Sequence, residues 1–373
     1  MKILIGKDIL FEGLQQVFSV IPQKPTLPVL TNFLLKVSSD RLFISGTDMD
    51  ISITTSMPCK IEGEGGVTVN AKRFISIIRE LPEGEVTINI ENERITIEFK
   101  NGRSSMMGMP DADFPTIRDS IEGVAVTLSG DDFFGMVDRT SFTAAVDRTR
   151  VALTGVYWRV SSDNMTMVAT DGHRLALFEK HVNIETDNVS EAIIPPKALS
   201  HAQRIYSGGI KLESVNVGQG MILFDFGVTT IFSKLIEGPY PDFMQVIPED
   251  NSKLVYVSTE DLSAAVRRVS VLSNSITHQV RFSLSSGKME ITTSNADIGG
   301  EANELIDVRY EGDPLLTGYN SFFLLEILRK IGTEELVMEL ETIISACILK
   351  PVEKEEKGEC LYLIMPLRIN EEQ

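Results

Sequence analysis

Residues 254–261, Leu-Val-Tyr-Val-Ser-Thr-Glu-Asp, predict a short β-strand that runs directly into an α-helix. Ser258, followed three residues later by Asp261, has the spacing of a capping box, which satisfies backbone amides that lack partners at a helix start. The helix that follows places Leu262, Ala265, Val266 and Val269 on one apolar stripe. This strand and helix form a unit that can be searched for elsewhere in the chain.

The same unit occurs three times in the sequence. Its first elements are Ile3-Leu4-Ile5 with a helix over Asp8–Ile21, Val124–Leu128 with a helix opened by Ser129 and Asp132, and the stretch above. A second helix follows about half a repeat later in each copy, at Ala71–Leu81, Pro196–Tyr206 and Ser321–Ile331. β-like runs precede these helices at 66–69, 192–194 and 315–317. Three copies of one unit favour a structural array over a single catalytic cleft.

Between the helices, apolar and polar residues alternate as they do in half-buried antiparallel strands. Examples are 41–46, 85–90 and 288–292. Because strands outnumber helices, the predicted class is α+β with antiparallel sheets. With 373 residues, the chain accommodates three tandem domains, which we expect at 1–123, 124–251 and 252–373.

Composition narrows the function classes. No apolar run approaches the ~20 residues that a membrane-spanning helix needs, and the charged N-terminus does not have the pattern of a signal peptide, so we expect a cytoplasmic protein. Cys59, Cys347 and Cys360 form no Cys-x-x-Cys pair, which indicates free thiols. There is no phosphate-binding glycine loop and no His-Glu-x-x-His motif, and we expect no metal and no cofactor.

The formal net charge of −18 argues against nucleic acid as a partner. The distribution of charge matters more than its sum, and cations gather on the helices outside their apolar stripes. They are Lys72, Arg73, Arg79, Lys197, Arg204, Arg267, Arg268, Arg329 and Lys330. Acidic residues instead gather in expected turns, as at Glu62 with Glu64. These helix faces are either merely solvated surfaces of mixed charge or one basic side shared by the six helices.

The segment 169–175, Ala-Thr-Asp-Gly-His-Arg-Leu, is the best local candidate for chemistry. Asp171-Gly172 between two β-like runs predicts a tight hairpin turn with a positive φ. An enzyme would use His173 as a base oriented by Asp171. Neighbours in a turn point in different directions, however, and no nucleophile or metal-ligand cluster accompanies them. A turn without catalysis is therefore the favoured interpretation.

At these residues the chain resembles the bacterial DNA polymerase III β subunit family, the β sliding clamps, from end to end. The resemblance rests on Lys24–Leu30 (Lys-Pro-Thr-Leu-Pro-Val-Leu), Gly46-Thr47-Asp48, Ala112-Asp113-Phe114-Pro115, the run 169–176, Pro241-Asp242-Phe243 and Met365–Ile369 (Met-Pro-Leu-Arg-Ile). The run at 169–176 is specific, and the order of the motifs makes coincidence improbable.

The resemblance implies a non-catalytic processivity factor of DNA polymerase. Three clamp domains per protomer would close head to tail as a homodimer into a six-domain ring around duplex DNA, with helices lining the hole and sheets outside. A ring holds DNA by topology, so its lining cations need only weak phosphate contacts. The residues expected to face DNA are Lys24, Lys72, Arg73, Arg79, Arg148, Arg150, Lys197 and Arg204.

The resemblance also implies a cleft between the second and third domains that receives short extended peptides from polymerases, the clamp loader and repair proteins. One wall is expected from Leu153, Thr170, Gly172, His173, Arg174, Leu175, Pro241 and Val246. The other is expected from Asn320, Phe323, Ile344, Leu363, Met365, Pro366, Leu367 and Arg368. An apolar slot with a few polar groups suits such a ligand, and the adaptable thioether of Met365 suits several partners.

Two departures from the family pattern bear on this cleft. Met244-Gln245 stands where the family often carries basic residues, and Asn370–Gln373 extends past the motif that usually ends the chain. For the dimer seam, we expect Met106 and Met107 of one protomer to approach Val271 and Leu272 of the other. Such a head-to-tail contact forms a ring only if its rotation closes.

Overall fold

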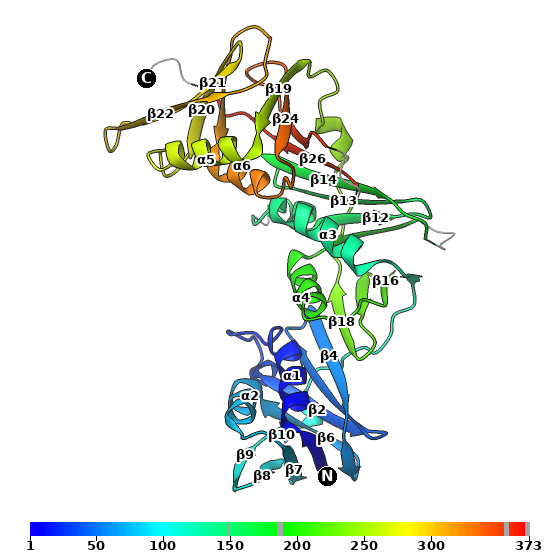
Figure 1. Cartoon of the computed structure of the whole chain (residues 1–373). Coiled ribbons are helices and arrows are strands. Elements are labelled where there is room, and N and C mark those ends of the chain that lie inside the picture. The colour runs from blue at the N-terminus through cyan, green and yellow to red at the C-terminus, as the bar shows by residue number, and fades with distance from the viewer. Residues whose placement is uncertain (148, 185–188, 354–357, 370–373) are drawn as a thin grey trace. The chain divides into compact units, whose positions relative to one another are not determined.

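The structure, a computed structural model, describes residues 1–147, 149–184, 189–353 and 358–369. The chain packs into two compact units (Figure 1). The first unit combines residues 1–130 with 197–235, and the second combines 131–196 with 236–373. No helix in the described ranges is long and apolar enough to cross a membrane.

The six expected α-helices are present, with ends within a few residues of the prediction. They are α1 (Lys7–Phe18), α2 (Ala71–Glu80), α3 (Gly130–Thr140), α4 (Pro196–Ser207), α5 (Thr259–Ser270) and α6 (Ser321–Leu328). Short 3₁₀ helices lie at η1 (Pro28–Thr31), η2 (Asp111–Asp113), η3 (Ser141–Thr143), η4 (Val151–Thr154) and η5 (Phe243–Val246).

The helix α5 shows why these segments are helical. Ser258 occupies the N-cap, and its Oγ accepts a hydrogen bond from the amide of Asp261 at 3.2 Å, which satisfies one of the helix's unpaired donors. Its predicted apolar stripe is buried throughout, from Leu262 to Val269. Period, cap and burial therefore agree along this helix.

The first unit contains two antiparallel sheets. One has the order β5-β1-β7-β8-β9, and the other has the order β10-β6-β2-β3-β4-β18-β17-β16-β11. The strands that precede α2 in the chain are β1 (Lys2–Gly6), β2 (Asn32–Ser38), β3 (Arg41–Thr47), β4 (Ile51–Pro58), β5 (Lys60–Glu62) and β6 (Gly65–Asn70). The others are β7 (Glu85–Glu91), β8 (Arg94–Phe99), β9 (Gly102–Met107), β10 (Met109–Pro110), β11 (Val124–Val126), β16 (Ser214–Gly218), β17 (Met221–Asp225) and β18 (Thr229–Lys234).

The second unit also contains two antiparallel sheets, in the orders β15-β12-β13-β14-β26-β25-β24-β19 and β22-β21-β20-β23. The strands of the longer sheet are β12 (Val156–Val160), β13 (Asn164–Thr170), β14 (Arg174–His181), β15 (Ser190–Ile194), β19 (Lys253–Ser258), β24 (Glu335–Leu340), β25 (Cys347–Pro351) and β26 (Glu359–Ile364). Those of the shorter sheet are β20 (Gln279–Ser285), β21 (Lys288–Asn295), β22 (Gly300–Asp307) and β23 (Leu315–Asn320).

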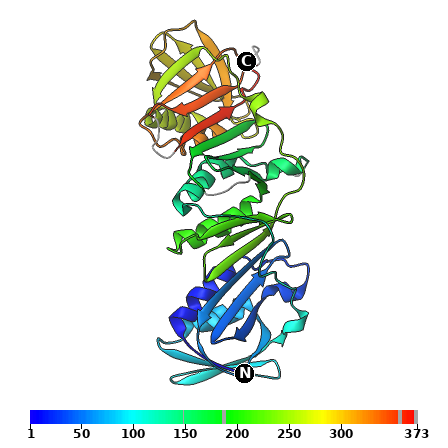
Figure 2. The same cartoon turned by 90° about the vertical axis from the view of Figure 1, so that its right-hand side faces the viewer.

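Consecutive repeats join by pairing strands across their boundary. In the first unit β4 pairs antiparallel with β18, and in the second β14 pairs antiparallel with β26. Figure 2 shows β26, in red, running beside the green β14. Each pairing removes two sheet edges, whose unpaired amides and carbonyls would otherwise template aggregation. The fold thus places residues from distant parts of the chain on one continuous sheet.

The described thiols are free, as expected from their number and spacing. Cys59 is half-buried, and Cys347 and Cys360 are buried without a disulfide. Burial raises the pKa of the Cys59 thiol, and the nearby Asp40 carboxylate adds to that effect.

Candidate peptide-binding cleft and basic surface

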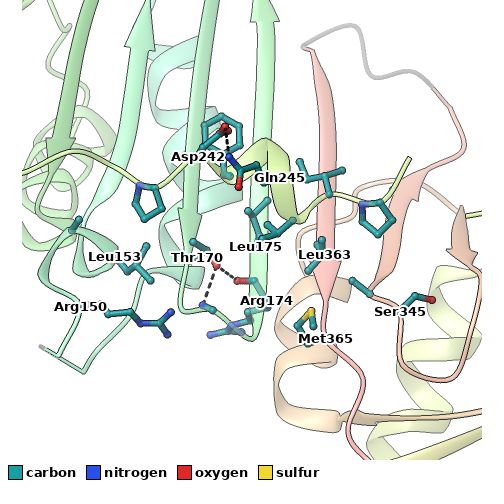
Figure 3. A pocket seen from close by; sticks show the side chains of 18 of the residues that line it. Arg150, Leu153, Thr170, Arg174, Leu175, Asp242, Gln245, Ser345, Leu363 and Met365 are labelled. Atoms are coloured by element: carbon teal, nitrogen blue, oxygen red, sulfur yellow. Dashed lines mark hydrogen bonds between the residues drawn. The ribbon is translucent and has the colours of Figure 1, made fainter. Parts of the chain in front are cut away.

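A cavity of about 690 Å³ lies on the second unit, where β14 meets β26 (Figure 3). Its lining is mostly apolar. It is formed by Arg150, Val151, Ala152, Leu153, Thr170, Gly172, Arg174, Leu175, Pro241, Asp242, Phe243, Gln245, Val246, Ile247, Pro248, Ser345, Ala346, Leu363 and Met365. The volume falls within the range of small-molecule sites.

The floor of the cavity is built by two paired strands. Leu175 on β14 stands opposite Leu363 on β26 in the ladder, and both are buried in one apolar cluster that also contains Leu177 and Ala346. Just past β26, the amide of Met365 donates to the carbonyl of His173 at 2.8 Å. The Met365 side chain is 41% exposed, so it is available to a ligand above the floor.

The segment 240–248 crosses the cavity as its roof. Tyr240 stacks on Tyr157 of β12 with ring centroids 5.2 Å apart. Asp242 caps η5 by accepting from the Met244 amide at 3.2 Å, and its other oxygen accepts from Gln245 Nε2 at 3.1 Å. Gln245, where the family often has a basic residue, therefore lines the cavity as a neutral side chain that is bonded to the roof.

The predicted hairpin turn forms the lower edge of the cavity. Gly172 has a φ of +87°, which confirms the expected positive φ and requires glycine because other residues are strained there. A Cβ on Gly172 would also lie 2.5 Å from Nη2 of Arg150. That nitrogen donates to the carbonyl of Asp171 at 3.0 Å, so Arg150 lies against the turn.

Arg174 fixes the turn from beneath. It is buried, and its Nε donates to Asp171 Oδ2 at 3.1 Å while its Nη1 bonds to Glu326 of α6 at 2.5 Å. Its Nη2 donates to the carbonyl of Phe142 at 3.1 Å, and its guanidinium lies 4.3 Å from the ring centroid of Phe323. A planar five-donor group suits such a site. Arg174 thus ties the turn to α6.

The turn does not build a catalytic pair. Asp171 Oδ1 accepts from the amides of His173 and Arg174, and its Oδ2 accepts from the Arg174 guanidinium. His173 is exposed, and its ring stacks at 6.4 Å on Phe323. The carboxylate therefore serves the turn and does not orient His173 as a base.

Nine of the sixteen residues expected in the cleft line the cavity. They are Leu153, Thr170, Gly172, Arg174, Leu175, Pro241, Val246, Leu363 and Met365. His173 and Phe323 line a neighbouring cavity of about 520 Å³. Asn320 caps α6 by accepting from the amides of Phe322 and Phe323. Ile344 is 74% exposed beside Ser345, and Pro366, Leu367 and Arg368 continue the chain beyond Met365.

Several lining residues escaped the sequence prediction. Most lie on the roof, at Asp242, Phe243, Gln245, Ile247 and Pro248, and on η4, at Val151 and Ala152. The predicted wall took only Pro241 and Val246 from this segment, so their neighbours up to Pro248 were missed. Ser345 and Ala346 come from a turn whose approach to β26 follows only from strand pairing.

The eight cations expected to face DNA differ in what they contact. Lys24, Lys72 and Arg73 are exposed and form no ion pair within the described ranges. Arg79 pairs with Glu80 at 3.0 Å, with both side chains exposed. Lys197 pairs with Asp48 and Arg204 donates to backbone carbonyls of α1. Arg150 lines the cleft. Arg148 lies outside the described residues, as do Asn370–Gln373.

The residues expected at the dimer seam expose apolar surface. Met107 on the edge strand β9 is 58% exposed, and Val271, directly after α5, is 77% exposed. Met106 and Leu272 beside them are half-buried. Exposed apolar residues at an edge strand are typical of contact surfaces, and the pairing itself stays a prediction.

Comparisons with solved structures define the class of protein. The chain matches a DNA polymerase III β subunit from Pseudomonas aeruginosa with a TM-score of 0.93, 29% identity and coverage of 99% of this chain and 100% of that one. A DNA polymerase sliding clamp from Caulobacter crescentus matches with a TM-score of 0.92 and 30% identity over the same shares. The fold is therefore that of the sliding clamps, which are non-catalytic.

Sequence relatives identify the family. Models of the N-terminal, central and C-terminal domains of the DNA polymerase III beta subunit match residues 1–118, 127–242 and 244–368. The "Beta sliding clamp" of Proteus mirabilis and that of Haemophilus influenzae are each 31% identical over 99% of this chain and their whole length. The chain belongs to the DNA polymerase III β subunit family, as expected, with three tandem clamp domains. The boundaries at 123/124 and 251/252 stay predictions.

Proposed function

We propose that two copies of this chain close head to tail into a ring that encircles duplex DNA without reading its sequence. The ring tethers the replicative polymerase in the bacterial cytoplasm and serves as a platform for the clamp loader and repair proteins. This proposal rests on the end-to-end likeness to sliding clamps, which covers 99% of this chain and 100% of each of the compared proteins. Encirclement explains how a chain of net charge −18 can work on DNA.

In a closed ring, attachment is topological, so phosphate contacts can be few and weak. Lys24, Lys72 and Arg73 support this proposal because they are exposed cations without ion pairs among the described residues. Exposed acidic turns elsewhere disfavour binding of DNA outside the ring. Weak contacts allow the ring to slide.

The cleft is the proposed docking site for extended peptide segments of partner proteins. Its apolar floor of Leu175 and Leu363 would hold aliphatic or aromatic side chains, and polar groups on the turn and roof would fix the peptide backbone. Sliding clamps from Pseudomonas aeruginosa and Bartonella birtlesii have been solved bound to griselimycin. The same compound is a suitable probe for this cleft.

The test is retention on DNA. The protein is loaded with its clamp loader and ATP onto a nicked circular plasmid, the complex is isolated, and the circle is cut once at moderate salt. Loss from the linear form with retention on the circle is the expected result. Equal retention on both forms would mean that direct affinity holds the protein and would refute the ring.

The alternative, a hydrolase or transferase centred on His173 and Asp171, makes the opposite prediction for His173→Ala. An enzyme would lose turnover, whereas the proposed clamp would keep encirclement and change only the affinity of peptide ligands. The bonding of Asp171 to the turn supports the second outcome.

A further inference from the structure

Two cations and a buried histidine share one side of α4. Lys197, His201 and Arg204 are spaced i, i+4 and i+7, which places them on the same side of a helix. The family resemblance implies that Lys197 and Arg204 face DNA. In the first unit, however, Lys197 and Arg204 contact residues of the first repeat.

Arg204 bonds to the end of α1. Its Nη2 donates to the carbonyl of Gln15 at 2.9 Å and to that of Gln16 at 3.0 Å. Both carbonyls belong to the last turn of α1, where intrahelical amide partners run out and the helix dipole is negative. The last turn of α1 carries no basic residue of its own. Arg204 therefore supplies the cation that this helix end lacks.

Lys197 makes a second contact seven residues earlier. Its Nζ pairs with Oδ2 of Asp48 in the turn between β3 and β4. The Asp48 side chain is 14% exposed, and its Oδ1 accepts from the amides of Asp50 and Ile51. Burial alone would raise the pKa of Asp48, but the bonds from Lys197 and the two amides lower it below its usual value. The carboxylate is thus held in place to receive Lys197.

The second unit contains a contact equivalent to that of Arg204 with the end of α1. Lys330, which follows α6, bonds to Asp138 in the last turn of α3 at 2.7 Å. α6 is the second helix of its repeat and α3 the first helix of the preceding repeat, as are α4 and α1. A cation at the end of a second helix meets the end of the preceding first helix in both units. The recurrence argues that the contact is a property of the repeat.

We propose that Lys197 and Arg204 fasten the second repeat to the first, with Arg204 as the main positioning residue, and that neither is a principal DNA contact. The DNA half of this statement rests on the proposed function; the fastening half does not. The ion pair between Lys197 and Asp48 contributes little on its own, because the Lys197 side chain is 56% exposed. Arg204, with two charge-assisted bonds to carbonyls in the last turn of α1, contributes more.

The test compares Arg204→Ala, Arg204→Lys and Arg73→Ala in the full-length protein, because Arg73 on α2 is an exposed cation without such bonds. Amide hydrogen exchange is followed at residues 15–20. Binding to a 30-base-pair duplex is followed by fluorescence anisotropy over a range of salt. We expect Arg204→Ala to speed exchange at the α1 terminus about 10-fold or more with the salt slope unchanged. Arg73→Ala should lower the slope by about 0.9 with exchange unchanged.

If amide exchange at residues 15–20 were unchanged in Arg204→Ala, the proposal that Arg204 fastens the two repeats would be overturned. If Arg204→Ala lowered the salt slope of duplex binding as Arg73→Ala does, the proposal that Arg204 is not a principal DNA contact would be overturned. Arg204→Lys keeps one bond and the charge, so it should give intermediate exchange even if the alanine variant folds poorly. Wild-type binding that does not depend on salt would count against the proposed DNA function alone, since the exchange result would stand.

Discussion

Arg174 makes the sharpest prediction, because its removal affects stability and cleft shape together. The side chain is 7% exposed and pairs with Asp171 and Glu326, which are 16% and 26% exposed. Replacing it by alanine leaves two largely buried carboxylates without their cation. The change also removes the guanidinium from the face of Phe323.

Breaking a buried ion pair by deleting one member costs about 3–5 kcal/mol, since the other charge stays buried. The partial exposure of Glu326 places the expected loss near the lower limit, at about 3 kcal/mol. For a unit of about 200 residues, 3 kcal/mol corresponds to a fall in Tm of about 6–12 °C. Because Asp171 and Gly172 belong to the same turn, griselimycin should also bind more weakly.

Scanning calorimetry at one protein concentration measures the first effect, and isothermal titration with griselimycin measures the second. Arg159→Ala is the matched control, because Arg159 meets Glu191 at 3.5 Å with both side chains 54% exposed. Such an exposed pair contributes less than about 1 kcal/mol. If Arg174→Ala melted within about 2 °C of the wild type, the assignment of Arg174 as the support of the cleft would be wrong.

Three further predictions address the seam, the turn and pH. Leu272→Asp should bury an unpaired charge at the dimer seam and yield monomers; a dimer in analytical ultracentrifugation would place the seam elsewhere. Gly172→Ala should weaken griselimycin binding, because a Cβ at φ +87° is strained and meets Arg150; unchanged titrations would contradict this. The pKa of His201 is lowered to about 4, mainly by burial and then by the positive charges of Lys197 and Arg204. The Asp48 carboxylate opposes this effect only in part. The folded state thus binds fewer protons than the unfolded chain, so stability is full above pH 6.5 and should fall by roughly 1–3 kcal/mol towards pH 4. The His201→Gln protein, measured by urea unfolding across this range, should lose that part of the pH dependence.

The helices and strands were predictable because their causes are local. The apolar period of α5 and its Ser258 cap act within a few residues of one another, and the same holds for the turn at Gly172. Repetition of these local patterns indicated an array of three repeats. Family motifs at 24–30 and 169–176 then implied a clamp, which the comparisons confirm.

The joining of consecutive repeats within each unit depends on long-range strand pairing. Leu175 and Leu363 share the cleft floor because β14 pairs with β26 in one register, and a shift of β26 by one residue would turn Leu363 to the opposite face. No pattern within either strand identifies its partner. The roof from Tyr240 to Pro248 is likewise positioned by stacking on Tyr157, a contact between distant segments.

The roles of the cations were decided in the same way. Lys72 and Lys197 open equivalent helices and look alike in sequence, yet Lys197 meets Asp48 whereas Lys72 forms no ion pair in the described part of the chain. A helix pattern determines which residues leave the apolar stripe. It does not determine what they meet, because the neighbouring surface comes from another part of the chain. The chain's local chemistry thus determined its helices, strands and turns, and only packing between repeats decided which cations bind protein and which stay available.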